Sequence, residues 1–121
     1  MARSILHIEK EESVKALLSA LLKARGHHVE ATESGKEALE IAARLKPDLI
    51  IVGEELADID GIGLIVKIRS ELPPCPLIFI SKEWRDGAIY QQLKKDFKVD
   101  LVIHRPLKAG LLGAQIEGIF Q

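Results

Sequence analysis

Carboxylate, hydroxyl and cationic side chains stand directly after four short apolar runs of the chain. The four junctions are Glu9-Lys10, Gly53-Glu54-Glu55, Ser81-Lys82 and His104-Arg105-Pro106. Carboxylate and hydroxyl oxygens can ligate a hard cation such as Mg²⁺, and ammonium and guanidinium groups can bind anions. If the apolar runs are neighbouring parallel strands, their carboxyl ends meet at one edge, and these side chains form one site there.

The apolar runs alternate with segments of helical periodicity. Strands are predicted over 4–8, 29–32, 49–52, 77–80 and 99–103, and the uninterrupted run 49–52 is typical of a strand buried on both faces. Helices are predicted over 14–22, from a cap at Ser34 to Pro47, from a cap at Asp60 through Ile68, roughly over 84–96, and from Pro106 onward. This alternation predicts an α/β fold, a flavodoxin-like three-layer (βα)5 sandwich with a parallel five-stranded sheet in the order 2-1-3-4-5.

Length and composition restrict the class of protein. The 121 residues suit one domain with its own core, over residues 1–121. The formal net charge of -1 gives no reason to expect nucleic acid or a membrane as a partner. The single cysteine, Cys75, forms no internal disulfide, and the sequence contains neither a secretory segment nor an apolar run of membrane-spanning length. We therefore expect a cytoplasmic location.

The four junctions together resemble one known family. The segment Ile5-Leu6-His7-Ile8-Glu9-Lys10-Glu11 resembles a first strand that ends in paired acids, and Pro47-Asp48-Leu49-Ile50-Ile51-Val52-Gly53 resembles the strand that ends in a phosphorylated aspartate. Pro76-Leu77-Ile78-Phe79-Ile80-Ser81 is similar to the fourth strand with its terminal hydroxyl, and His104-Arg105-Pro106 stands where the family has Lys-Pro. The whole chain thus resembles the receiver domain of two-component response regulators, of the chemotaxis-regulator kind.

The resemblance implies a phosphorylation pocket whose chemistry is incomplete. The family's reaction needs a carboxylate nucleophile, a divalent cation, a hydroxyl and a lysine. Here Glu9 keeps one carboxylate and Ser81 keeps the hydroxyl, but Lys10 replaces the second acid, Gly53 replaces the nucleophile and Arg105 replaces the lysine. The resemblance therefore implies a degenerate pseudo-receiver without the phosphoacceptor aspartate, which is not an enzyme and holds no metal or cofactor. Lys10 either substitutes for the metal beside Glu9 or points to solvent.

Two other functions are considered. Glu54 or Glu55 could serve as a surrogate phosphoacceptor, although strand alternation points Glu54 to the side opposite position 53 and Glu55 belongs to the outgoing loop. A small-molecule binder of the flavodoxin type is disfavoured, because no phosphate-cradling loop follows the first or third strand. The favoured function is a phosphorylation-independent signalling module that acts through protein–protein interaction.

The resemblance also implies a changed switch and a docking face. The switch aromatic of the family corresponds to Val102, so a single conformation is expected. A helical wheel places Ala109, Leu112, Ile116 and Ile119 towards the sheet. The opposite, apolar side is predicted to bind a protein partner, another domain of a parent protein, or weakly a second copy; its residues are Leu107, Gly110, Leu111, Ala114 and Gly118, with Trp84 nearby.

The histidines and the remaining aspartates receive structural interpretations. His7, His27, His28 and His104 lack the spacing of a metal motif. We expect His7 to be a hydrogen-bonded core residue and His27-His28 to form an exposed turn. Asp60, directly before Gly61, is expected to cap a helix.

Overall fold

Strands and helices alternate along the whole chain, as the periodicity of the sequence predicts. The computed structural model describes residues 2–82 and 87–121. The strands are β1 (Ser4–Ile8), β2 (His28–Thr32), β3 (Leu49–Gly53), β4 (Leu77–Ser81) and β5 (Leu101–His104). The helices are α1 (Glu12–Ala24), α2 (Gly35–Leu45), α3 (Gly61–Glu71), α4 (Gly87–Asp96) and α5 (Ala109–Ile119). In the described residues, no helix is both long enough and apolar enough to cross a membrane.

The strands form one parallel sheet in the order β2-β1-β3-β4-β5, which confirms the predicted topology. Its register brings the strand ends together: Ile8 pairs with Val52, Gly53 with Ile80, and Ser81 with His104. Polar residues that follow β1, β3, β4 and β5 therefore meet at one edge of the sheet.

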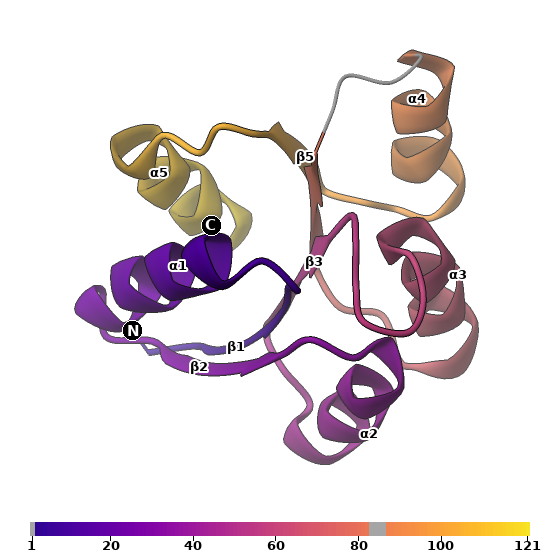
Figure 1. The fold of residues 1–121 in the computed structure, drawn as a ribbon, viewed down its shortest axis with the longest axis horizontal. Coiled ribbons are helices and arrows are strands. Elements are labelled where there is room, and N and C mark those ends of the chain that lie inside the picture. The colour runs from indigo at the N-terminus through magenta and orange to yellow at the C-terminus, as the bar shows by residue number, and fades with distance from the viewer. Residues whose placement is uncertain (1, 83–86) are drawn as a thin grey trace.

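Helices cover both faces of the sheet, as Figure 1 shows: α1 and α5 lie on one side, and α2, α3 and α4 lie on the other. Successive side chains of a strand point to opposite faces, so each strand contributes to two cores. In β3, Leu49 and Ile51 pack with α1 and α5, whereas Ile50 and Val52 pack with α2, α3 and α4. Gly53 follows Leu49 and Ile51 in this alternation, so it belongs to the face of the sheet that α1 and α5 cover.

Two predicted helix caps are confirmed. The Ser34 side chain accepts a hydrogen bond from the backbone N–H of Glu37 at 3.2 Å, and Asp60 accepts one from the N–H of Gly63 at 2.6 Å. The backbone N–H of Ser34 itself donates a hydrogen bond to Thr32 Oγ1 at 3.3 Å. These caps fix where α2 and α3 begin.

The last helix begins later than predicted. Helix α5 starts at Ala109 with Lys108 as its N-cap, so Pro106 lies in the preceding loop and not in the first turn. Helix α4 is described from Gly87, and the predicted start at Trp84 lies outside the described residues. The predicted inward position of Ala109 is wrong, because this residue is exposed. Ala109 is the first residue of α5, and the buried residues of the helix, Leu112, Gly113 and Ile116, all follow it.

Two expectations for the histidines are wrong. His7 is buried, but neither ring nitrogen has a hydrogen-bond partner among the described residues. His27 is buried and not part of an exposed turn: Nδ1 accepts from the N–H of Arg3 at 3.1 Å, and Nε2 lies 2.8 Å from Glu117 Oε1. His27 thereby ties the start of the chain to α5, a contact between distant segments that local patterning does not reveal.

Candidate functional site

The candidate site lies at the carboxyl edge of the sheet, where four strands end side by side. Glu9 follows β1, Gly53 ends β3, Ser81 ends β4 and Arg105 follows β5. The parallel register brings these positions to a common edge, as the sequence predicts. What the strand register does not determine is how the side chains pair with one another.

Glu9 occupies the space beside Gly53. Its side chain is buried, with the residue only 3% exposed, and Oε2 accepts a hydrogen bond from the N–H of Glu11 at 2.9 Å. A Cβ built on Gly53 would overlap the Glu9 carboxylate and lie only 3.0 Å from its Cδ. The side chain that would carry a phosphoacceptor is thus absent, and a neighbouring carboxylate fills its place.

The environment of Glu9 favours its neutral form. Burial raises the pKa of the Glu9 carboxyl, and the N–H of Glu11 and the charge of Arg105 offset part of that rise. Desolvation is the largest of these contributions. Glu9 is therefore a poorly solvated acid whose charged form is stabilised in part by the charge of Arg105.

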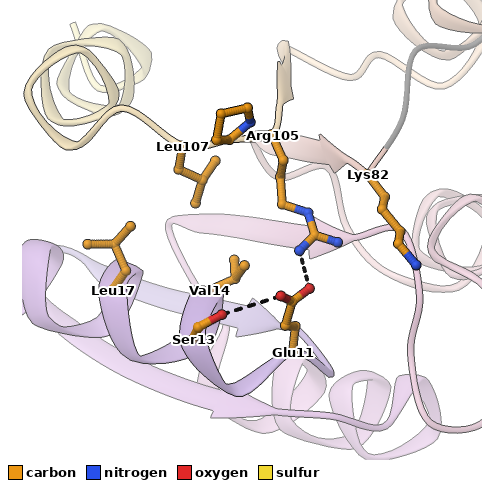
Figure 2. A pocket seen from close by; sticks show the side chains of 8 residues that line it. Glu11, Ser13, Val14, Leu17, Lys82, Arg105 and Leu107 are labelled. Atoms are coloured by element: carbon orange, nitrogen blue, oxygen red, sulfur yellow. Dashed lines mark hydrogen bonds and ion pairs between the residues drawn. The ribbon is translucent and has the colours of Figure 1, made fainter.

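The interpretation of Lys10 as an internal replacement for a metal is wrong. Lys10 is exposed, and no ion pair joins it to another of the described residues. The ion pair at this edge is made by the next residue: Glu11 pairs with Arg105 across the edge of the sheet, as Figure 2 shows. The Arg105 guanidinium, first by hydrogen bonding and then by its charge, lowers the pKa of Glu11. Sequence reasoning missed Glu11, although it directly follows the Glu9-Lys10 junction.

Glu54 and Glu55 both bind the segment that follows β4. Glu54 Oε1 accepts hydrogen bonds from Ser81 Oγ and from the backbone N–H of Lys82, each at 3.1 Å. Glu55 pairs with the Lys82 ammonium at 3.0 Å. Strand alternation correctly places Glu54 on the side opposite Gly53, but Ser81 lies on that side too, so the Glu54 carboxylate reaches the hydroxyl of the site.

An aromatic residue does contact the Ser81 hydroxyl, but it comes from α4 and not from β5. Tyr90 Oη lies 3.0 Å from Ser81 Oγ, and the Tyr90 ring meets the His104 ring edge-on with centroids 4.9 Å apart. Val102, the predicted switch position, pairs with Phe79 and packs into the core under α4. Sequence reasoning missed Tyr90, although its position three residues before the buried Leu93 indicates a sheet-facing side chain.

Beside this site lies an open groove of about 570 Å³ between α1 and the loop that leads to α5. In Figure 2, Leu17 and Leu107 lie on opposite sides of the groove, and the Glu11–Arg105 pair closes one end of it with Lys82 nearby. The prediction that Leu107 belongs to the outer face of the last helix is wrong. Leu107 precedes α5 and packs, half-buried, against the core under α1 and α5.

The other predicted interface residues of α5 are exposed. Leu111 is 58% exposed, and Gly110, Ala114 and Gly118 lie on the same solvent-facing side of the helix. A Cβ added at Gly110 or Gly118 would meet no atom within 4 Å. Trp84, the remaining predicted contact, lies outside the described residues.

The donor set at this edge does not fit a magnesium ion. Magnesium requires several hard oxygen ligands in near-octahedral geometry. The Glu9 carboxylate is buried against Gly53, that of Glu11 pairs with Arg105, and that of Glu54 accepts from Ser81 and Lys82. No group of three potential ligand side chains that could hold a metal ion is present in residues 2–82 and 87–121.

Comparison with known proteins identifies the family. The model of the response regulator receiver domain matches residues 5–117, so the chain belongs to the receiver-domain family of two-component response regulators. The sheet order and the site at the carboxyl ends of the strands agree with this assignment.

The similarity to known relatives extends over nine-tenths or more of this chain. The chain is 27% identical over 121 residues to the alkaline phosphatase synthesis transcriptional regulatory protein PhoP of Bacillus subtilis, covering 100% of this chain and 50% of PhoP. It is 30% identical over 111 residues to the response regulator protein VraR of Staphylococcus aureus, covering 90% of this chain and 52% of VraR. A two-component response regulator from Clostridium difficile has the same fold, with a TM-score of 0.86 at 26% identity over 97% of this chain and 94% of that one. The chain spans about half the length of PhoP and VraR.

Proposed function

We propose that this domain is a pseudo-receiver, a phosphorylation-independent signalling module that acts by binding a protein partner and catalyses no reaction. The observation that carries the proposal is the relationship between Gly53 and Glu9. An aspartyl phosphate requires a carboxylate nucleophile at the end of β3. Gly53 offers none, and the Glu9 carboxylate fills the space into which such a side chain would extend.

The charges at the site support the same proposal. Phosphoryl transfer needs a cation to neutralise the charge that develops on the transferred group. The acids that could hold that cation are engaged within the protein: Glu11 with Arg105, and Glu54 with Ser81 and Lys82. Lys10, at the position of the second metal-binding acid, adds a positive charge at the edge instead.

One observation favours a second candidate function, phosphorylation of a surrogate carboxylate. Glu54 reaches the Ser81 hydroxyl, so a carboxylate does lie within the site. Glu55 is less suitable because its carboxylate pairs with the Lys82 ammonium on the exposed side of the loop. As a nucleophile, Glu54 would have to give up both hydrogen bonds and attack without a metal to neutralise the donor, which makes it the weaker candidate.

We propose the outer face of α5 as the binding surface. An exposed, apolar helix face that is also rich in small residues lets a partner approach closely. Leu111, Gly110, Ala114 and Gly118 form such a face. The partner is a separate protein or another domain of a parent signalling protein, and weak pairing with a second copy is the third arrangement. The proposal includes a cytoplasmic location for the module.

Treatment with beryllofluoride and magnesium tests the proposal, because the beryllofluoride anion forms a phosphoryl-like adduct only on an accessible carboxylate. Fluorine NMR of the native chain should show no protein-bound fluoride signals. Bound signals that disappear in Glu54→Gln and persist in Glu55→Gln would favour the surrogate phosphoacceptor and contradict the proposed function.

A further inference from the structure

Glu54 makes an unusually well-defined contact for a side chain at the start of a loop. Two donors, the Ser81 hydroxyl and the Lys82 backbone N–H, converge on one oxygen, Oε1, at 3.1 Å each. Hydrogen bonds to an ionised carboxylate are roughly twice as strong as those between neutral groups. One of the two donors is buried, since Ser81 is fully covered, so the bond is partly shielded from water.

The backbone of Glu54 is held as firmly as its side chain. Its carbonyl oxygen accepts a hydrogen bond from the Gly61 N–H at 2.7 Å, which ties the end of β3 to the first residue of α3. A side chain at Gly61 would overlap the carbonyl of Gly53, so this close approach requires glycine. Asp60 caps the same helix through Gly63. Hydrogen bonds thus hold both the backbone and the carboxylate of Glu54 in place.

The contact continues beyond Ser81 into α4. The Ser81 hydroxyl lies 3.0 Å from Tyr90 Oη, and the Tyr90 ring packs edge-on against His104 of β5. Leu93 is the buried residue of α4, and Tyr90 packs against the core one turn before it. The chain of contacts from Glu54 through Ser81 to Tyr90 therefore joins the β3–α3 loop to α4.

We propose that Glu54 is a tethered anionic ligand that positions Ser81 and Tyr90, and so holds α4 in one orientation without phosphorylation. The inference rests on the proposed function and deepens it, because it gives the chain its own source of the negative charge at the site. Glu54 is a positioning residue: it acts on α4 through Ser81. The arrangement fixes how α4 packs against the sheet.

Glu55 provides a matched control. It is the adjacent acid and binds the same residue, but through the Lys82 ammonium at 3.0 Å, without contact to Ser81. Effects that come only from removing a negative charge from the loop should appear in both Glu54→Ala and Glu55→Ala. Effects that come from the contact of the Glu54 carboxylate with Ser81 and the Lys82 N–H should appear in Glu54→Ala and not in Glu55→Ala.

The test uses proton–nitrogen and aromatic NMR spectra of the native chain, Glu54→Ala and Glu55→Ala. In Glu54→Ala, the Lys82 amide proton should shift upfield and exchange with solvent about tenfold faster, because it has lost a charge-assisted bond. The Tyr90 ring signals should move with it. Added sodium acetate should reverse both changes saturably in Glu54→Ala and should have no such effect on the native chain or Glu55→Ala.

Glu54→Gln keeps the size of the side chain but offers a weaker, neutral acceptor, so it should move the Lys82 and Tyr90 signals in the same direction as Glu54→Ala. Unchanged signals in both Glu54 variants, equal changes in Glu55→Ala, or no response of Glu54→Ala to acetate would overturn the inference. Phosphorylation of the native chain would instead overturn the proposed function, whatever these spectra show.

Discussion

The carboxylate of Glu9 lies directly against the Cα of Gly53, in the space where a side chain at the end of β3 would begin. The two residues are complementary: the buried acid fits because position 53 has no Cβ, and a Cβ at position 53 would require the Glu9 carboxylate to shift. The N–H of Glu11 fixes the acid in this place with a hydrogen bond of 2.9 Å. This pair explains how the edge of the sheet stays packed although Gly53 has no side chain.

The packing of Glu9 against Gly53 predicts that substitutions at these two positions have non-additive effects on the free energy of unfolding. Gly53→Ala should lower the free energy of unfolding by about 1–3 kcal/mol, the usual cost of overpacking. Combined with Glu9→Ala, it should cost much less than the sum of the two single changes, because the clash is gone. Urea unfolding of the two single variants and the double variant measures the coupling.

Gly110→Ala is the control for this cycle. A Cβ at Gly110 meets nothing within 4 Å, and alanine is favoured over glycine in a helix by about 1 kcal/mol. This change should therefore leave stability unchanged or raise it. Additive effects of Gly53→Ala and Glu9→Ala would show that Glu9 moves away freely and does not fill the site.

His7 predicts a characteristic dependence of stability on pH. Burial, and to a lesser extent the charge of Lys15, lowers the pKa of His7 to about 4 from 6.5. Between these two pH values the unfolded chain binds a proton that the folded chain does not, so the folded state loses stability as the pH falls. The full loss from this one group is on the order of 3 kcal/mol, present below pH 4 and absent above pH 7.

Thermal or urea unfolding from pH 7 to pH 4 measures this effect in the native chain and in His7→Leu. The raised pKa of Glu9 has the opposite sign, since the folded state then binds the proton more readily, so only the difference between the two chains isolates His7. That difference should grow steadily as the pH falls below 6.5. A pH-independent difference would show that His7 gains a partner when it is protonated.

The proposed α5 surface predicts separate effects on binding and on folding. Leu111→Glu and Ala114→Arg should weaken self-association or partner binding and leave the melting temperature nearly unchanged, since both side chains are exposed. Leu112→Ala, one residue along but 1% exposed, should cost about 2–5 kcal/mol of stability. Sedimentation velocity with parallel thermal melts separates the two effects.

Unchanged sedimentation of Leu111→Glu would exclude self-association through this face. Unchanged affinity for an identified partner would remove the proposed interface altogether. A large loss of stability in Ala114→Arg would mean that the helix packs with the opposite face from the one described.

The sequence predicts those parts of this fold that depend on pattern and leaves open those that depend on distant contacts. The uninterrupted apolar run at 49–52, the caps at Ser34 and Asp60 and the order of strands all follow from local chemistry and topology. The proposed loss of the acceptor rests on one position in the sequence, Gly53. Local patterning did not show that His27 is buried, because its partners are Arg3 and Glu117.

The pairing of charges at the site is the least predictable part. Seven acids and cations follow the strands, and a small rotation of a loop decides which of them meet: Glu9, Lys10, Glu11, Glu54, Glu55, Lys82 and Arg105. The sequence left Lys10 either beside Glu9 or in solvent; the turn after β1 leaves it exposed and gives Glu11 the contact with Arg105. Alternation placed Glu54 opposite Gly53 correctly, yet its contact with Ser81 depends on the direction of β4, which a separate segment determines.

Restoring the missing acids predicts a gain of metal binding. The native chain should show no saturable heat on titration with millimolar magnesium. The double change Lys10→Asp with Gly53→Asp adds two carboxylates beside that of Glu9 and should create a magnesium site, with some loss of stability in the absence of the ion because like charges are brought together. Strong magnesium binding by the native chain would contradict the description of the site.

Exposure of the native chain to acetyl phosphate and magnesium, followed by intact-mass measurement, tests the central claim most directly. We expect the native chain to gain no phosphoryl group, because Gly53 supplies no nucleophile and Glu9 occupies its space. The Lys10→Asp and Gly53→Asp double variant, treated in parallel, shows whether the conditions support the reaction. A phosphoryl group on the native chain, mapped to Glu54, Glu55 or Glu9, would contradict the account.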